Sequence, residues 1–255
     1  MEAYTEDMAT TDGRVPGQRG RLTRQRLLDA TVELLTTTSW RSVKVTDIAR
    51  QAQTSPATFY QYFANVEQAI QVLAEGMVDE AGELAGLVGG DWSEETSWDT
   101  AREVTEGFLS YWEDNRAVFR VVDLATEEGD AQLRGIRVRA LNAVTVSLAQ
   151  VIAAASPSPE AGPGAATSSP AGADPMAVAG TLVAMFASVS AHRYGFEFWG
   201  IRTRNLIDTQ ARMLHWAVTG RPAPAPESPR RETVRPRTGP VLGGATTRRR
   251  PRGAS

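Results

Sequence analysis

The sequence predicts an all-α protein in which a small N-terminal helical domain is joined by one long helix to a larger helical domain. Apolar residues recur three and four positions apart along most of the chain, whereas no segment keeps the strict alternation typical of a strand. Helix-starting and helix-ending residues separate these apolar segments. With 255 residues, of which 42% are hydrophobic, the chain is long enough for two domains with separate cores.

The first domain is predicted over residues 21–66. It follows residues 1–20, which are polar, show no helical pattern and predict a flexible arm. Apolar side chains at helical spacing predict a first helix over residues 22–37. Thr46 is predicted to cap a second helix of about two turns, because a threonine oxygen can accept a hydrogen bond from a free amide of the first turn.

A third and a fourth helix have clear start signals. Ser55 followed by Pro56 predicts the start of the third helix, since Ser caps the free amides and Pro at the first helical position loses no hydrogen bond. Asn65 and Gln68 resemble a capping box at the start of the fourth helix. This helix is predicted to continue to about Leu87, long enough to join two domains.

The larger domain is predicted over residues 67–220. Within it, residues 156–173 are almost entirely Ser, Pro, Gly and Ala, a composition that predicts a disordered loop. The Pro- and Arg-rich residues 221–255 predict a disordered basic tail. The remaining segments show helical spacing and predict helices over residues 96–115, 116–127, 130–154, 175–199 and 202–219.

Charge is distributed unevenly along the chain. Residues 14–66 contain eight Arg or Lys and three acidic residues, a net charge of +5, and residues 221–255 contain nine Arg and two Glu, a net charge of +7. Because the whole chain has a net charge of −3, the part between them is strongly acidic. A basic end on an acidic body indicates a polyanionic partner at that end.

Several classes of function are disfavoured by what the sequence lacks. There is no cysteine, and we find no metal-ligand cluster, no Gly-rich phosphate loop and no Gly-x-Ser-x-Gly elbow. We therefore expect no metal site, no cofactor and no enzymatic activity. The acidic start of the chain is unlike a secretory signal, and the nearly uncharged run from Met176 to Ala191 is too short to cross a bilayer, so we expect a cytoplasmic protein without a membrane span.

A helix, a short second helix, a tight turn and a short third helix form the order typical of a DNA-binding helix-turn-helix. Residues 45–52 and 55–63, which end in Thr-Phe-Tyr-x-Tyr-Phe, resemble the DNA-binding signature of the TetR (tetracycline repressor) family. The resemblance is strong over about residues 22–70 and general elsewhere. Gln53 departs from it, since the family commonly has Gly near this position, and we expect a left-handed residue in the turn. Asn65-Val66-Glu67 lacks the lysine that often opens the fourth helix.

The resemblance implies a transcriptional regulator that binds a palindromic double-stranded DNA operator as a homodimer and responds to a small-molecule effector. Short side chains at the start of the third helix are expected to approach base edges, and hydroxyl or basic groups around them are expected to contact phosphates. Phe59 and Phe63 are expected in the core. The predicted DNA-binding residues are Arg21, Arg24, Lys44, Thr46, Thr54, Ser55, Ala57, Thr58, Tyr60 and Tyr62.

The resemblance also implies an effector cavity between about residues 90 and 220, with the last two helices at the dimer interface. Aromatic and Met side chains there suggest a mostly apolar ligand. Its predicted lining is Phe108, Tyr111, Trp112, Phe119, Met185, Phe186, His192 and Phe196. Whether the protein represses or activates transcription stays open, as does a non-specific architectural role based on the arginine tail.

Overall fold

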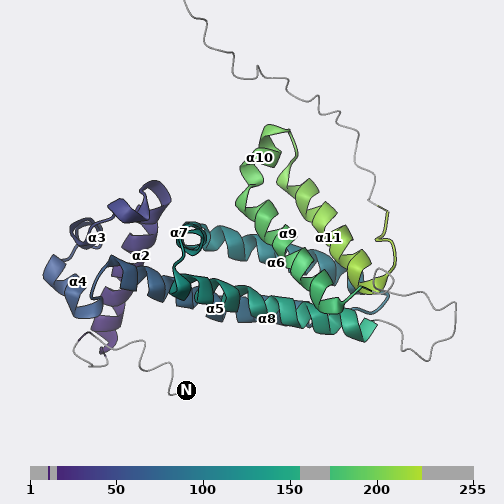
Figure 1. The fold of residues 1–255 in the computed structure, drawn as a ribbon, viewed down its shortest axis with the longest axis horizontal. Helices are drawn as coiled ribbons and strands as arrows, with labels where there is room; N and C mark the ends of the chain where they lie inside the picture. Colours follow the sequence, from purple (N-terminus) through teal and green to yellow (C-terminus); the bar gives the residue numbers. More distant parts are fainter. Residues whose placement is uncertain (1–10, 12–15, 156–172, 226–255) are drawn as a thin grey trace, which may run out of the picture.

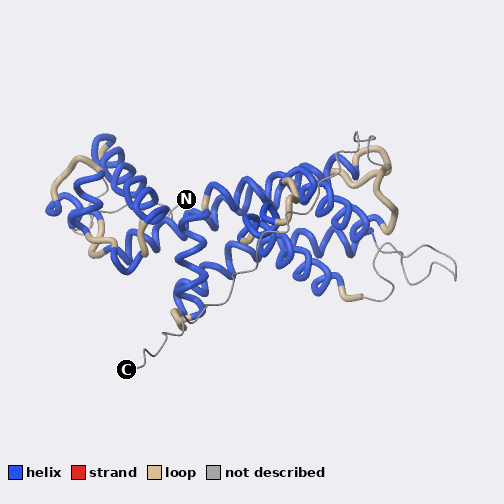
Figure 2. The backbone as a smooth tube through the Cα atoms, turned by 90° about the horizontal axis from the view of Figure 1, so that it is seen from above, coloured by secondary structure: helices blue, strands red, loops and turns tan. Residues whose placement is uncertain are grey.

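The computed structural model describes residue 11 and residues 16–155 and 173–225, and over these residues it contains helices and no strand (Figure 2). The prediction of an all-α protein is confirmed. A small group of helices lies at one end of an elongated molecule and a larger group at the other (Figure 1). Most of the arm (residues 1–10 and 12–15), the loop (156–172) and most of the tail (226–255) lie outside the described residues, and their predicted disorder stays a prediction.

The N-terminal domain consists of α2 (Gln18–Thr37), the short 3-10 helix η1 (Trp40–Ser42), α3 (Val45–Gln51) and α4 (Pro56–Tyr62). The start of the next helix closes its core. Leu27, Leu35, Ile48, Phe59 and Phe63 are each at most 1% exposed and form the centre of that core.

The long joining helix is α5 (Val66–Val88). Its first turns bury Val66, Ala69 and Ile70 in the N-terminal core, whereas Met77 and Leu84 further along belong to the second core. One rigid element therefore shares its buried face between both domains.

The C-terminal domain contains α6 (Ser97–Asp114), α7 (Arg116–Glu127), α8 (Ala131–Ala155), α9 (Pro175–Ala191), α10 (Arg193–Phe198) and α11 (Thr203–Thr219). Helix α8 packs along α5 and α9, and α11 packs against α6 (Figure 1). The helix α11 ends at Gly220, whose φ of 66° is left-handed and costs glycine little.

Helix α8 is long and apolar enough, by length and composition alone, to cross a membrane. Its apolar residues instead form part of the core: Ile136, Val144, Leu148 and Ile152 are each at most 2% exposed. We therefore treat α8 as the central helix of this domain.

Three details differ from the sequence prediction. The first helix begins at Gln18 rather than at residue 22, because its first turn needs only backbone bonds, such as that from Arg21 N to Gly17 O, and no apolar side chain. Thr46 is not a cap: the amides of Asp47 and Ile48 both bond to Lys44 O, which makes Lys44 the extended capping residue and places Thr46 inside the first turn.

The third difference is a break in the helix predicted over residues 175–199. It divides at His192 into α9 and α10. The amide of Gly195 bonds to His192 O, three residues back, so the regular i to i−4 ladder is interrupted there. A glycine at this point also lowers the helix propensity.

Candidate nucleic-acid interface and effector cavity

The turn between α3 and α4 is a Schellman motif with a non-glycine residue at its left-handed position. Thr54 N donates to Ala49 O at 2.8 Å and Gln53 N donates to Arg50 O at 3.1 Å. Gln53 has a φ of 54°, which confirms the expected left-handed residue. The turn fixes the direction in which α4 leaves α3 at the cost of some backbone strain.

The start of α4 is held by two hydroxyl groups. Ser55 Oγ accepts a hydrogen bond from Thr58 N at 3.1 Å, and Pro56 occupies the first helical position, so the predicted start signal is confirmed. Ser55 Oγ and Thr58 Oγ1 also lie 2.9 Å apart as a hydrogen-bonded pair. Both hydroxyls therefore stand together at the end of α4 that the sequence assigned to base contacts.

Most of the predicted DNA-binding side chains lie from Lys44 through α3, the turn and α4, and Arg21 and Arg24 lie on α2. Their neighbours Phe59 and Phe63 are fully buried, as expected. Exposed positions alternate with half-buried ones because one face of each short helix turns toward the N-terminal core, where α3 packs on α2 and on α4. The exposed residues are Arg21, Lys44, Thr46, Ser55, Ala57 and Tyr60, and the half-buried ones are Arg24, Thr54, Thr58 and Tyr62.

Two residues of the predicted set are partly engaged in packing within the protein. The guanidinium of Arg24 lies over the ring of Phe63, 5.4 Å from its centroid. Arg21 Nη1 donates to Pro16 O at 3.3 Å. These contacts hold the two arginines along α2, beside the recognition helix.

Thr11 contacts the end of α4, which the sequence gave no reason to expect. Its amide donates to Gln61 O at 2.9 Å, and its hydroxyl donates to Tyr60 O at 3.0 Å. These carbonyls are at the C-terminal end of α4, where no following turn of helix supplies donors. Thr11 therefore caps the recognition helix from a segment 49 residues earlier in the chain.

The aromatic residues predicted to line a cavity form instead a closely packed cluster. The rings of Trp112 and Phe119 stack with centroids 4.0 Å apart, and Phe108 lies 5.4 Å from Phe186. Tyr111 donates from its hydroxyl to Met77 O at 2.9 Å, and burial raises the pKa of this phenol above its usual value. These side chains are mainly core.

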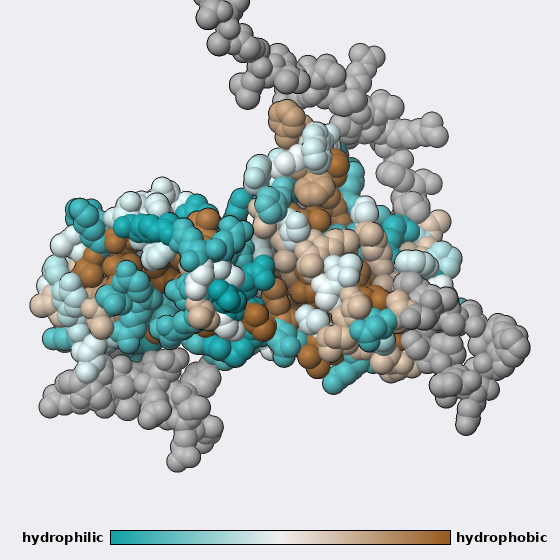
Figure 3. Space-filling view, viewed as in Figure 1, coloured by the Kyte–Doolittle hydropathy of each residue, from teal (hydrophilic) through white to brown (hydrophobic). Residues whose placement is uncertain are grey.

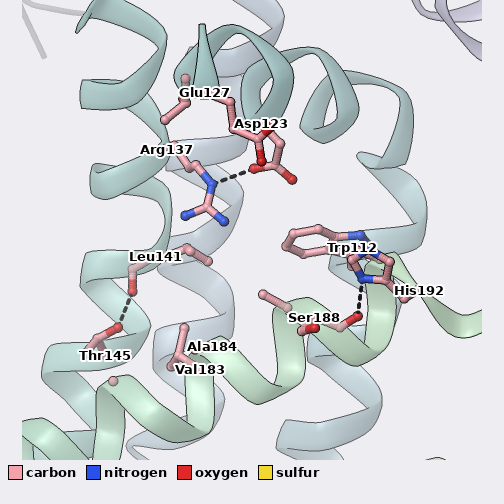
Figure 4. Close-up of a pocket in the computed structure, with 14 residues that line it drawn as sticks. Trp112, Asp123, Glu127, Arg137, Leu141, Thr145, Val183, Ala184, Ser188 and His192 are labelled. Carbon is pink, nitrogen blue, oxygen red and sulfur yellow. Dashed lines mark hydrogen bonds and ion pairs between the residues drawn. The ribbon is translucent and has the colours of Figure 1, made fainter. Parts of the chain in front are cut away.

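A pocket of about 490 Å³ lies beside this cluster, between α6, α7, α8 and α9 (Figure 4). Of the predicted residues, Trp112 and His192 line it. Phe119 lines an adjoining hollow of about 800 Å³, which shares Trp112 and His192 with the first. The lining of the 490 Å³ pocket is Trp112, Asp123, Thr126, Glu127, Arg137, Leu141, Thr145, Gly180, Val183, Ala184, Ala187, Ser188, Ala191 and His192.

The two remaining predictions for the cavity, Met185 and Phe196, lie outside the lining of both hollows. Met185 is half-buried and packs against the core, and Phe196 makes an edge-to-face contact with Trp199, 5.9 Å between centroids.

Apart from His192, the polar groups of the pocket were not found from the sequence. Arg137 Nε of α8 lies 2.5 Å from Asp123 Oδ1 of α7, and Thr126 is one turn further along α7. The chain carries many charged residues at similar spacings, so no local signal distinguishes this pair. Only the packing of α7 on α8 brings the two together.

Helix α7 lies between the pocket and the N-terminal domain. Val121 is 2% exposed and belongs to the N-terminal core, whereas Phe119 and Val122 belong to the other core. Arg120 donates to Leu35 O at the end of α2, and just after α7 Glu128 pairs with Arg41. One short helix thus contacts the pocket on one face and the N-terminal domain on another.

The last helices carry a large exposed apolar surface. Ten large hydrophobic residues are exposed in the part of the chain that the structure describes, and six of them lie in the segment from α9 to α11. Figure 3 shows brown and tan residues over this part of the molecule. The six are Met176, Tyr194, Phe198, Trp199, Met213 and Trp216.

A capped recognition helix with exposed hydroxyls, a long joining helix and a separate helical domain define a helix-turn-helix regulator. Comparison with known families agrees: residues 27–68 match the bacterial regulatory proteins of the tetR family, and residues 84–225 match the tetracyclin repressor-like C-terminal domain. The second match covers more than half of the chain. The chain belongs to the TetR family of DNA-binding transcriptional regulators, and neither match describes an enzyme.

Three solved structures share the fold. FadR from Bacillus halodurans, a fatty acid degradation regulator, superposes with a TM-score of 0.58 and 13% identity over 79% of this chain and 96% of its own. Bacillus subtilis FadR in complex with stearoyl-CoA gives 0.55 and 17% over 77% and 98%, and Salmonella enterica GusR gives 0.56 and 19% over 77% and 95%. No curated protein sequence matches the chain.

Proposed function

We propose that this protein is a homodimeric, cytoplasmic repressor that binds a palindromic operator through α4 and releases it when a small ligand enters the C-terminal domain. The observation that supports this most is the start of α4. Its capped end presents the Ser55 and Thr58 hydroxyls and the small side chain of Ala57 at the surface. Short side chains there allow the helix backbone to approach base edges in the major groove.

The proposed dimer interface is the apolar surface on α9, α10 and α11. Two recognition helices must lie about 34 Å apart, or a multiple of it, to enter successive major grooves, which a monomer cannot provide. Replacing Met213 and Trp216 together with Asp is expected to yield monomers in analytical ultracentrifugation and to abolish operator binding. Val138→Asp, on an equally exposed apolar residue of α8, is the matched control and should remain dimeric.

The proposed switch passes through α7 as well as through α5. A ligand in the pocket touches Asp123 and Glu127 of α7, and the same helix is bonded to α2 through Arg120 and packs Val121 into the N-terminal core. A small displacement of α7 would move the recognition helix and change the spacing in the dimer. A ligand that binds without altering operator affinity would contradict this part of the proposal.

The DNA-binding proposal is tested by selecting bound fragments from random DNA with the full chain. We expect a palindromic site whose half-sites are one helical turn or a multiple apart. Thr58→Val should weaken binding to that site by about tenfold, the value of one hydrogen bond. Thr100→Val, on α6 and far from α4, serves as the control and should bind normally.

Phosphate contacts should behave differently from base contacts. Lys44→Ala is expected to weaken binding to all duplexes alike and to reduce the slope of log affinity against log salt by about one. If Lys44→Ala changed sequence preference while Thr58→Val did not, the assignment of the two side chains would be reversed.

An architectural role of the basic tail predicts a different outcome. A chain ending at Ala225 keeps all described contacts of the C-terminal domain, including those of Arg221 and Pro224. Specific operator binding should survive this truncation if α4 reads the DNA. Loss of all binding would favour the architectural alternative, and a reporter gene controlled by the selected site would distinguish repression from activation.

A further inference from the structure

We propose that the pocket between α6, α7, α8 and α9 binds a small carboxylic acid with an apolar body, whose carboxylate is held by Arg137. This inference rests on the proposed function only in taking the pocket as an effector site. It names the chemical class of ligand, which neither the family match nor the fold provides.

Arg137 is oriented as a carboxylate receptor. Its Nε is bound by Asp123 Oδ1 at 2.5 Å, which fixes the plane of the guanidinium. Its two terminal nitrogens make no hydrogen bond to any residue that the structure describes, and Figure 4 shows them directed away from Asp123, on the side of Leu141. A guanidinium fork presented in this way matches the two oxygens of a carboxylate.

The rest of the pocket suits an apolar body. The ring of Trp112 forms one wall, and Leu141, Val183 and Ala187 form others, so the carboxylate site lies at one end of a mostly hydrocarbon surface (Figure 4). Apolar walls with a few convergent polar groups are typical of small-molecule sites.

Thr126 supplies an independent observation. The residue lines the same pocket, and its hydroxyl oxygen is buried and has no hydrogen-bond partner among the described residues. A buried polar atom without a partner is unfavourable, and a ligand atom within reach would satisfy it. The second oxygen of a carboxylate, or a hydroxyl on the ligand, has the required chemistry.

Charge disfavours a polyanionic ligand. The acidic residues Glu113, Asp114 and Glu127 around the two hollows would repel the several phosphates of a coenzyme A thioester. An organic cation is the rival ligand, because Asp123 and Glu127 also line the pocket, and the test below includes one. A single carboxylate requires only the one guanidinium.

The test uses three probes that share a ten-carbon chain and differ in their head group: decanoate, decanol and decyltrimethylammonium. Isothermal titration of each into the full-length protein, without DNA, measures binding directly. We expect decanoate to bind at least about tenfold more tightly than decanol, as a charge-assisted hydrogen bond provides, and the ammonium to bind most weakly. Tighter binding of the ammonium, equal binding of decanoate and decanol, or no binding of any probe would overturn the proposal.

Three variants locate the site. Arg137→Gln removes the charge and is expected to weaken decanoate binding by about ten- to a hundredfold while leaving decanol unaffected. Arg137→Lys keeps the charge but loses the planar guanidinium, and its affinity for decanoate should lie between those of the unchanged protein and of Arg137→Gln. Arg134→Gln, an exposed arginine one turn earlier on α8, is the matched control.

Thr126→Val separates a ligand contact from a structural role. Because the hydroxyl has no hydrogen-bond partner among the residues that the structure describes, its loss should not lower the thermal midpoint, whereas decanoate binding should weaken by about fivefold. Unchanged decanoate binding in both Thr126→Val and Arg137→Lys would refute the assignment even if Arg137→Gln failed to fold. Since these titrations contain no DNA, their outcome is independent of whether operator selection succeeds.

Discussion

The two domains differ in the apolar surface and the hollows that they leave open. In the N-terminal domain the core is closed around Phe59 and Phe63, and among its described residues Leu22 and Tyr60 are the large hydrophobic side chains that are exposed. In the described part of the C-terminal domain eight such side chains are exposed, and hollows of about 490 and 800 Å³ lie beside its aromatic cluster. In the proposed regulator a ligand and a second copy cover what the C-terminal domain leaves open.

This difference indicates where rigidity and change are located in the regulator. A DNA-binding surface must hold its geometry before DNA binds, since ordering it on binding would lower the affinity. In the proposed switch the C-terminal domain has two arrangements of similar free energy, and a ligand in the pocket favours one of them. Helices α5 and α7 each contribute residues to both cores, so they connect the two domains.

The largest effect is expected from opening the closed core. Phe59→Ala should lower the free energy of unfolding by about 3–5 kcal/mol, because the ring is fully buried and its removal leaves a cavity. Urea unfolding followed by circular dichroism measures this. The adjacent Tyr60→Ala, which removes a half-exposed ring, is the control, and similar losses for both would mean that the N-terminal core is not closed.

A substitution in the turn between α3 and α4 is expected to raise the stability rather than to lower it. Gln53→Gly is expected to raise the stability of the N-terminal domain by about 1 kcal/mol, because Gly adopts the positive φ without the steric cost paid by Gln. Gln71→Gly, inside α5, should lower stability by about the same amount. Thermal unfolding of both variants checks the pair, and a destabilised Gln53→Gly would show that the side chain of Gln53 makes a contribution beyond its backbone.

The smallest expected effect is a dependence on pH in the C-terminal domain. His215 is 4% exposed, and its ring nitrogens lie 3.2 Å from Ser97 Oγ and from Arg221 O. Burial is the main cause that lowers the pKa of this imidazole below its usual value of 6.5. The unfolded chain therefore takes up the proton first, so the stability provided by neutral His215 is present above about pH 6.5 and is lost as the pH falls through that value towards the lower pKa of the folded state.

Thermal midpoints between pH 8 and pH 5 test this expectation. His215→Gln should flatten the decrease at low pH, whereas His192→Gln, at the exposed other histidine, should retain it. The same decrease in both variants would assign it to carboxylates instead.

The recognition helix was predictable because its signals are local. Ser55, Pro56, Asn65 and Gln68 determine helix starts through contacts within four residues, and each was confirmed. Thr46 was misassigned as a cap because two neighbouring positions were both able to start α3, and backbone conformation decided between them.

The pocket was not predictable in the same way. Aromatic residues such as Phe108 and Phe186 fit a cavity wall and a solid core equally well as a pattern, and they proved to be core. Asp123 and Arg137 are brought together by two helices whose register depends on all their side chains at once.

By itself the sequence determined the helical class and the start and end of most helices, since these depend on spacing and on neighbours along the chain. Only the tertiary structure decided which face of α7 meets α2, where the pocket opens and that Arg137 faces into it. Those properties depend on contacts between segments far apart in the chain, and the free energy of such contacts is set by the packing of the whole domain.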